Sequence, residues 1–198
     1  MANYYDIYIV GVGGQGVLTI ADIITLTATS KGINVNYYPT KGMAQRGGFV
    51  KAQLRLGRSS GNFGPSIPEG GADLVVSMEL SETLKAIRYA KEGADFVVLG
   101  NHFNPIAVML GKAPYPSEET VIGEIKKYGG KVNFLKPEEV PDFARDNLYT
   151  LGAIYKNTGL KKLFSQSEIE KTVADRWPKV AEGNIKTFRA GLEAEIYN

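Results

Sequence analysis

A glycine-rich turn between a predicted strand and a predicted helix constrains the fold of this chain more than any other feature. Apart from Asp6, residues 5–10 are β-branched or aromatic, and they run directly into residues 11–16, GVGGQG. Apolar residues then recur at helical spacing over residues 17–28, and Gly32 stands where a glycine would end the helix. Residues 33–38 alternate apolar and polar side chains, so the first 38 residues predict a β-α-β unit.

Strands continue to alternate with helices along the rest of the chain. Strands are expected at residues 49–56, 74–77, 95–99 and 132–135, helices at residues 80–90, 118–128 and 143–155, and two last helices, the first capped by Ser167 and Glu170 and separated from the second by Pro178. This order predicts an α/β fold, a Rossmann-like three-layer sandwich with a mostly parallel central sheet and helices on both faces. No repeat or long linker divides the 198 residues, so one domain spanning residues 1–198 is expected.

Composition narrows the possible functions. The formal net charge is only +2, from 23 basic and 21 acidic residues, so nucleic acid is not an expected partner. No apolar run reaches the roughly 18 residues of a membrane helix, and the first residues lack the basic start of a signal peptide. We therefore expect a cytoplasmic protein that has no membrane contact.

The chain also lacks the side chains that most redox and hydrolytic centres need. It has no cysteine, so it can give no thiolate to an iron–sulfur cluster, to zinc or to a covalent reaction. Its single histidine, His102, cannot build an ordinary zinc site. We expect no metal site and no catalytic residue in this chain.

The glycine turn satisfies the dinucleotide fingerprint GxGxxG, but only in part. A strand precedes it and a helix follows, so its backbone amides can receive an anion. The acidic residue that would bind the ribose of NAD is missing, because no Asp or Glu occurs between Asp22 and Glu69. Three interpretations stay open at this point: a nicotinamide dinucleotide site, another anion site, and glycines that only permit a sharp turn.

Basic residues fill the same stretch without an acidic neighbour in sequence. They are Lys31, Lys41, Arg46, Lys51, Arg55 and Arg58. Gln45 and Arg46 lie beside Gly47 and Gly48, where the guanidinium has room for bidentate contact with an anion. Lys51 and Arg55, in contrast, are expected on a solvent-exposed strand face.

Three further polar residues are weaker candidates. Asn101 and His102 follow a predicted strand, at the edge where open α/β sheets bind their ligands. For His102, a surface or capping role is the alternative. Asn147 lies in a predicted helix, where it serves equally well as a packing contact or as a site residue.

Two motifs together resemble the gamma-type subunit of the 2-oxoacid:ferredoxin oxidoreductases. They are Gly11-Val12-Gly13-Gly14-Gln15-Gly16 and Gly42-Met43-Ala44-Gln45-Arg46-Gly47-Gly48. The wording of the second motif is most similar to the indolepyruvate branch, whose corresponding chain is the beta subunit. Ala72-Asp73-Leu74, Asn147 with Leu151-Gly152-Ala153, and Gly183-Asn184 extend the resemblance over nearly the whole chain.

The resemblance implies a subunit of an oxygen-sensitive complex that oxidatively decarboxylates a 2-oxoacid, such as indolepyruvate or another aryl 2-oxoacid. Such complexes form an acyl-CoA from coenzyme A and pass electrons to ferredoxin. The chain has neither a thiamine-diphosphate motif nor cysteine, so a larger partner subunit is expected to hold thiamine diphosphate with Mg²⁺ and the iron–sulfur clusters. The isolated chain would be inactive, and it could form a homodimer.

The resemblance also implies where this chain meets its partner or an anionic ligand. The residues are Gly11, Gly13, Gly14, Gln15, Gly16, Met43, Gln45, Arg46, Gly47 and Gly48, with Lys41, Asn101, His102 and Asn147 as further candidates. Two other functions remain as alternatives: a stand-alone NAD(P)-dependent oxidoreductase, and a regulatory module that binds a nucleotide or coenzyme A.

Overall fold

A six-stranded sheet in the order β2-β3-β1-β4-β5-β6 forms the centre of the molecule. The computed structural model describes residues 4–42, 47–58 and 64–198, apart from the side chain of Lys41. The strands are β1 (Tyr5–Val12), β2 (Val35–Lys41), β3 (Phe49–Leu56), β4 (Ala72–Ser77), β5 (Ala90–Leu99) and β6 (Lys131–Leu135). Strands β1, β4, β5 and β6 run parallel, whereas β3 is antiparallel to both β1 and β2.

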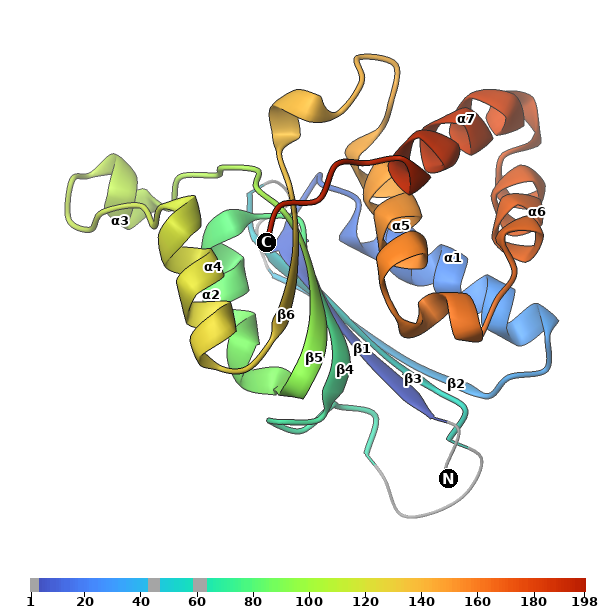
Figure 1. The fold of residues 1–198 in the computed structure, drawn as a ribbon, viewed down its shortest axis with the longest axis horizontal. Coiled ribbons are helices and arrows are strands. Elements are labelled where there is room, and N and C mark those ends of the chain that lie inside the picture. The colour runs from blue at the N-terminus through green and yellow to red at the C-terminus, as the bar shows by residue number, and fades with distance from the viewer. Residues whose placement is uncertain (1–3, 43–46, 59–63) are drawn as a thin grey trace.

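Helices cover both faces of this sheet (Figure 1). They are α1 (Val17–Ser30), α2 (Leu80–Ala86), α3 (Ile106–Met109), α4 (Glu118–Lys127), α5 (Asp146–Asn157), α6 (Gln166–Arg176) and α7 (Ala181–Leu192), with 3-10 turns at Ile87–Tyr89, Pro137–Glu139, Gly159–Lys162 and Pro178–Val180. Helices α1, α5, α6 and α7 lie on one face, and α2 and α4 lie on the other. The predicted three-layer α/β sandwich is confirmed.

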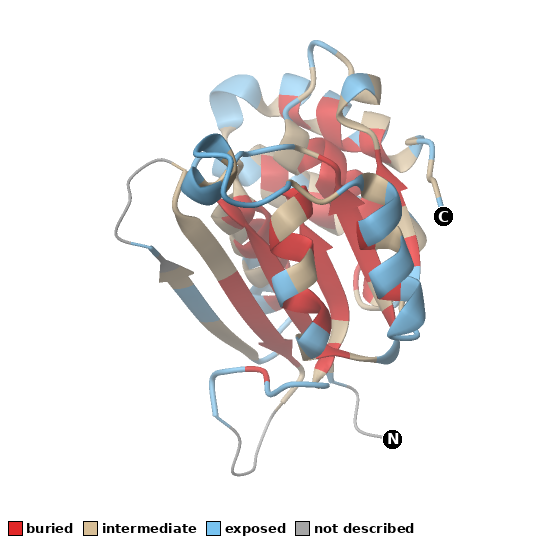
Figure 2. Cartoon of the chain, turned by 90° about the vertical axis from the view of Figure 1, so that its left-hand side faces the viewer, coloured by how far each residue is buried: buried red, intermediate tan, exposed pale blue. Residues whose placement is uncertain are grey.

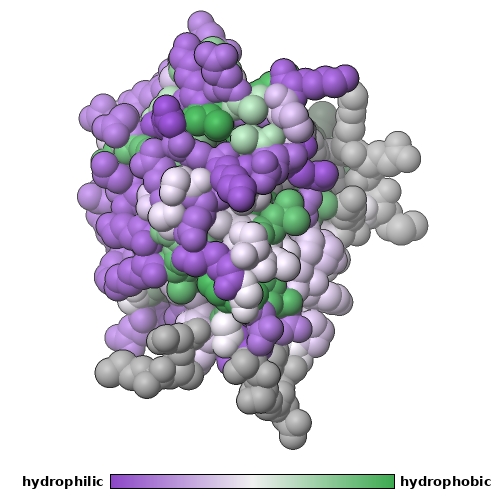
Figure 3. Space-filling view, turned by 90° about the vertical axis from the view of Figure 1, so that its right-hand side faces the viewer, coloured by the Kyte–Doolittle hydropathy of each residue, from purple (hydrophilic) through white to green (hydrophobic). Residues whose placement is uncertain are grey.

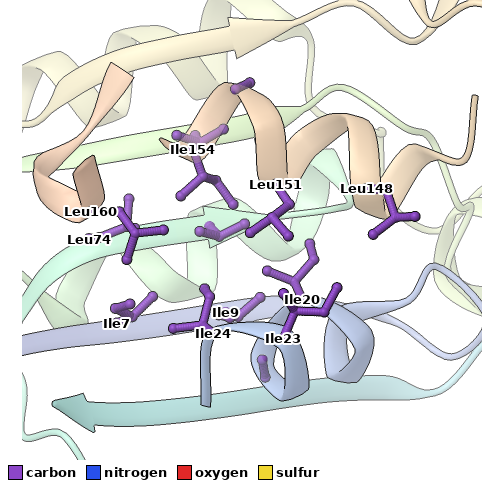
Figure 4. Close-up of a cluster of buried hydrophobic side chains, with 14 of the residues drawn as sticks. Ile7, Ile9, Ile20, Ile23, Ile24, Leu74, Leu148, Leu151, Ile154 and Leu160 are labelled. Atoms are coloured by element: carbon purple, nitrogen blue, oxygen red, sulfur yellow. The ribbon is translucent and has the colours of Figure 1, made fainter. Parts of the chain in front are cut away.

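Alternation along the buried strands supplies one core to each face. Ile7 and Ile9 of β1 point toward α1 and α5, where they meet Ile20, Ile24 and Leu151 (Figure 4). Tyr8 and Val10, the alternate residues of β1, join the second core under α2 and α4. Burial on both faces explains why residues 7–12 of β1 form a continuous run without a charged residue.

The outer surface of the α1 and α6 side is mostly hydrophilic. Figure 3 shows hydrophobic residues there only in small separate groups. Among the helices that the structure describes, none is both long enough and apolar enough to span a bilayer.

The predicted β-α-β unit is present but its two strands do not pair with each other. The antiparallel strand β3 lies between β1 and β2, with Val12 opposite Phe49 on one side and Lys41 opposite Val50 on the other. Because β3 runs backward, its first residues lie at the same sheet edge as the last residues of β1. The sequence predicts β3 as a strand but gives no local signal for its place in the sheet.

Several predicted boundaries need correction. The helix expected at residues 80–90 ends at Ala86, and the one expected at residues 143–155 begins at Asp146. The capping box predicted at Ser167 and Glu170 instead uses Ser165 and Glu168, because α6 starts at Gln166. Ser165 and Glu168 have the same three-residue spacing as Ser167 and Glu170, so the sequence alone does not show which pair caps the helix.

Arg55 is not on a solvent-exposed face. Its side chain is 6% exposed, and its Nε and one terminal nitrogen donate to the fully buried Asp6 carboxylate at 3.3 and 3.2 Å. The other terminal nitrogen donates to the carbonyls of Gly64 and Ser66. The chain after β3 folds back over this face, which is why Gln53 and Arg55 are buried, whereas Lys51 is half-buried.

Three of the four basic residues in this stretch whose side chains the structure describes therefore have carboxylate partners from distant parts of the chain. Arg58 donates to Asp6 at 3.1 and 2.6 Å, and Lys31 lies 3.0 Å from Glu168. The sequence lacks nearby acids, but the fold supplies them. The stretch is less strongly positive than the sequence indicates.

We expect Asp6→Asn to lower the free energy of unfolding by about 3–5 kcal/mol, because it removes the buried carboxylate charge that Arg55 and Arg58 both contact. Chemical denaturation monitored by circular dichroism measures this change. Glu124→Gln is the matched control, since its ion pair with Lys127 lies on the surface. A control effect as large as that of Asp6→Asn would contradict the assigned role of burial.

Candidate functional site

Two glycine bends meet at the edge of the sheet where β1 ends and β3 begins. The amide of Gly13 donates to the carbonyl of Gly48 at 2.8 Å, and the amide of Gly47 donates back to the carbonyl of Gly13 at 3.4 Å. We call residues 11–16 and 47–48 together the double glycine bend. Antiparallel pairing of β1 with β3 brings the two parts together, although they are more than 30 residues apart in the sequence.

Within the first bend, the side chain of Gln15 folds back onto its own turn. Its Oε1 accepts a hydrogen bond from the amide of Val12 at 2.9 Å. A Cβ at Gly11 would lie 2.8 Å from this same oxygen, so glycine leaves room for the contact. Gln15 thus shapes the bend with its carbonyl oxygen, a role that the sequence did not reveal.

Gly16 ends the bend and starts α1. Its φ of 81° is left-handed, and no side chain caps the helix behind it. A Cβ on Gly16 would lie 2.2 Å from Nδ2 of Asn147, so α1 and α5 begin in direct contact. Asn147 is half-buried, and its Oδ1 accepts a hydrogen bond from the amide of Leu148.

A buried carboxylate follows the neighbouring strand β4 at this same edge. Glu79 is fully buried, and its Oε2 accepts hydrogen bonds from Ser81 and from the amide of Glu82, both at 2.8 Å. Its Oε1 accepts from the amide of Phe103 at 3.1 Å and from the hydroxyl of Tyr115. Four donors thus satisfy one charge that would otherwise be costly to bury.

Residues 103–115, which we call the α3 arm, begin and end on this carboxylate. Burial, and next the hydrogen bond to Glu79, raise the pKa of Tyr115 to about 12. The phenol therefore stays protonated and keeps donating at any physiological pH. His102 is exposed, and its ring lies 4.8 Å from that of Tyr115, while Asn101 donates to Asp146 at 2.8 Å.

The edge lies where two chain directions diverge. From β1 the chain continues into α1 on one face, and from β4 it continues into α2 on the other. Open α/β sheets bind ligands in the crevice outside such a point. In the described residues, no group of three or more His, Asp or Glu side chains is placed to hold a metal ion.

Comparison with known proteins shows which family the chain belongs to. The sequence pattern of one family, described as pyruvate ferredoxin/flavodoxin oxidoreductase, matches residues 6–194.

The chain belongs to this family.

Relatives of similar length support the assignment to the pyruvate ferredoxin/flavodoxin oxidoreductase family. The chain is 33% identical to indolepyruvate oxidoreductase subunit IorB of Methanothermobacter thermautotrophicus, over 96% of this chain and 97% of that one. It is 28% identical to the pyruvate/ketoisovalerate oxidoreductases common subunit gamma of Thermococcus kodakarensis, over 81% and 82%. The crystal structure of pyruvate oxidoreductase subunit PORC from Thermotoga maritima shares the fold, with a TM-score of 0.69 at 19% identity over 98% and 99% of the chains. The resemblance stated from the sequence is confirmed.

The residues predicted for the site of this family member fall into three groups. Gly11, Gly13, Gly14, Gln15, Gly16, Gly47 and Gly48 lie together in the double glycine bend. Asn147 touches Gly16, whereas Asn101 and His102 lie nearby at the end of β5. Met43, Gln45, Arg46 and the side chain of Lys41 lie outside the described residues.

Sequence reasoning missed Glu79 and Phe103. Glu79 follows the predicted strand at residues 74–77, so the sequence could have predicted that it lies at the carboxyl edge of the sheet. The sequence could not have predicted the burial of Glu79, because its four hydrogen-bond donors come from segments up to 36 residues away. Phe103 packs on the bend itself, since a Cβ at Gly47 would lie 2.3 Å from its Cζ.

We expect Gly16→Ala to be more destabilising than Gly32→Ala. Both glycines have left-handed φ, so each alanine costs about 1–2 kcal/mol in backbone strain. Only Gly16 also contacts Asn147, which adds about 1–3 kcal/mol of overpacking. Denaturant unfolding of both variants measures the difference, and equal losses would show that the contact is relieved by a small shift.

Proposed function

We propose that this chain is the subunit without cofactors of a 2-oxoacid:ferredoxin oxidoreductase that acts on indolepyruvate or another aryl 2-oxoacid. The complex would oxidatively decarboxylate its substrate to an acyl-CoA and pass the electrons to ferredoxin. Support for the aryl substrate comes from sequence identity, which is 31–33% to the IorB relatives and 25–28% to the pyruvate/ketoisovalerate gamma relatives.

The double glycine bend is the observation that carries this proposal. It brings the backbone of two distant segments together at the carboxyl edge of the sheet, where Gly14 is exposed and Gly13, Gly16, Gly47 and Gly48 are half-buried. Such a surface can be approached closely by another protein or by an anionic group. We propose that it packs on the larger subunit near the cofactor, or receives an anionic part of the substrate or of coenzyme A, and that Gln45 and Arg46, its neighbours in the sequence, contribute to this contact.

The proposal assigns the reactive groups to the partner. Thiamine diphosphate with Mg²⁺ and the iron–sulfur clusters of the larger subunit would supply decarboxylation and electron transfer. This chain has no cysteine to bind a cluster. Its own residues would hold the partner in position, complete the wall of the substrate site and exclude water from it.

Two features disfavour the alternative of a stand-alone NAD(P)-dependent oxidoreductase. The amide of Gly13, the second glycine of the fingerprint, already donates to Gly48. The strand beside β1 is β3, so the end of β2, where a ribose-binding residue would stand, is one strand farther away. A regulatory module that binds a nucleotide or coenzyme A alone is the other alternative.

Affinity capture of the tagged full-length chain from its source cells under anoxic conditions tests the proposal. We expect a larger thiamine-dependent, cysteine-rich subunit, and ferredoxin reduction that requires both indolepyruvate and coenzyme A. Calorimetry of the isolated chain with NADH and NADPH should give no binding. A lone chain that binds a nicotinamide cofactor would refute the proposal, and tight binding of a nucleotide or coenzyme A by the lone chain would favour the regulatory module.

We further expect Arg46→Ala to lower the turnover of the assembled complex by roughly 10- to 100-fold. The reason is the loss of a charge-assisted contact worth about 1.5–3 kcal/mol. The free energy of unfolding of the isolated chain should not change. Lys127→Ala, on an exposed helix end, is the control. Wild-type turnover of the Arg46 variant would show that Arg46 is not part of the site.

A further inference from the structure

The three most exposed of the large apolar side chains that the structure describes lie on the α3 arm. Ile106 is 75% exposed, Met109 73% and Leu110 62%, and Phe103 at the base of the arm is 43% exposed. Helix α3 has no buried residue at all, and Figure 2 shows the arm as an exposed projection beside the sheet edge. A helix with exposed apolar residues and no buried face lacks the packing that normally stabilises one.

The arm is nevertheless held in a defined position. Glu79 accepts hydrogen bonds from the amide of Phe103 at its start and from the hydroxyl of Tyr115 at its end. Within the arm, Met109 and Val108 both donate to the carbonyl of Pro105, and Lys112 donates to that of Ala107. A segment fixed in this way loses little conformational entropy when a partner covers it.

The arm is continuous with the double glycine bend. The ring of Phe103 lies where a side chain on Gly47 would stand, so the apolar projection and the glycine surface touch. The single short helix is far smaller than the roughly 800 Å² per partner of a stable interface. The arm can therefore act only as one part of a larger surface, and the double glycine bend is the adjoining part.

We propose that the α3 arm is the docking element that inserts Ile106, Met109 and Leu110 into an apolar groove of the larger subunit. This inference rests on the proposed function, because that subunit is the partner it names. The larger subunit is the expected occupant because the arm is continuous with the double glycine bend, which the proposed function places against that subunit. The arm carries only Lys112 as a charged residue, as expected at the apolar centre of a stable interface.

A competition experiment in the assembled complex tests this proposal. Wild-type and variant chains with different tags are produced together with the larger subunit, and their ratio in the purified complex is measured. We expect the triple variant Ile106→Ser, Met109→Ser, Leu110→Ser to be incorporated at least 100-fold less than wild type. The matched control, Leu26→Ser, Tyr128→Ser, Val180→Ser, removes three apolar side chains that are 42–49% exposed elsewhere, and it should stay within threefold of wild type.

A second measurement does not depend on how the variants fold. A photo-crosslinking amino acid at position 109 should form an adduct with the larger subunit, and the same group at position 26 should not. Equal incorporation of the triple variant, or no adduct from position 109, overturns the docking role and leaves the proposed function standing. Adducts only between two copies of this chain also overturn it. If the wild-type chain assembles with no larger subunit, both proposals fail.

Discussion

The antiparallel insertion of β3 beside β1 is the constraint on which the site depends. Because β3 runs backward, its first residues stand next to the last residues of β1, and two bends from distant parts of the sequence share main-chain hydrogen bonds. A parallel strand in that position would place the second bend at the opposite edge. The same insertion separates β2 from β1, so the end of β2 lies one strand farther from the glycine turn than in a dinucleotide-binding β-α-β unit.

Local patterns predicted most of the elements, and tertiary contacts decided what they missed. The strand, glycine turn and helix at the N terminus follow from spacing alone, as does the layered α/β class. The place of β3 in the sheet and the burial of Arg55 do not, because they depend on which strands pair and on where residues 64–71 fold back. A charge pattern in sequence cannot show that Asp6 supplies the missing acid from 49 residues away.

The site shows the same division. The glycines were recognisable because a sharp turn and a close approach leave few alternatives to that residue. Glu79 was not, because its role depends on donors gathered from α2 and from both ends of the α3 arm. One buried charge thereby connects the core of the sheet to its most exposed apolar projection. The buried sheet edge and the exposed α3 arm are thus linked by hydrogen bonds to one side chain.

The outer edge of the sheet has a different character. The amide of Gly42 donates to the carbonyl of Phe49 and so points toward β3. Along an antiparallel strand, successive amides point alternately toward the partner strand and away from it, so the nitrogen of Pro39 in β2, three residues earlier, points away from β3. Because proline has no backbone N–H, Pro39 cannot donate a hydrogen bond to a strand of another molecule that pairs with the outer edge of β2. This border of the sheet is therefore a poor template for the sideways pairing of a strand from another molecule.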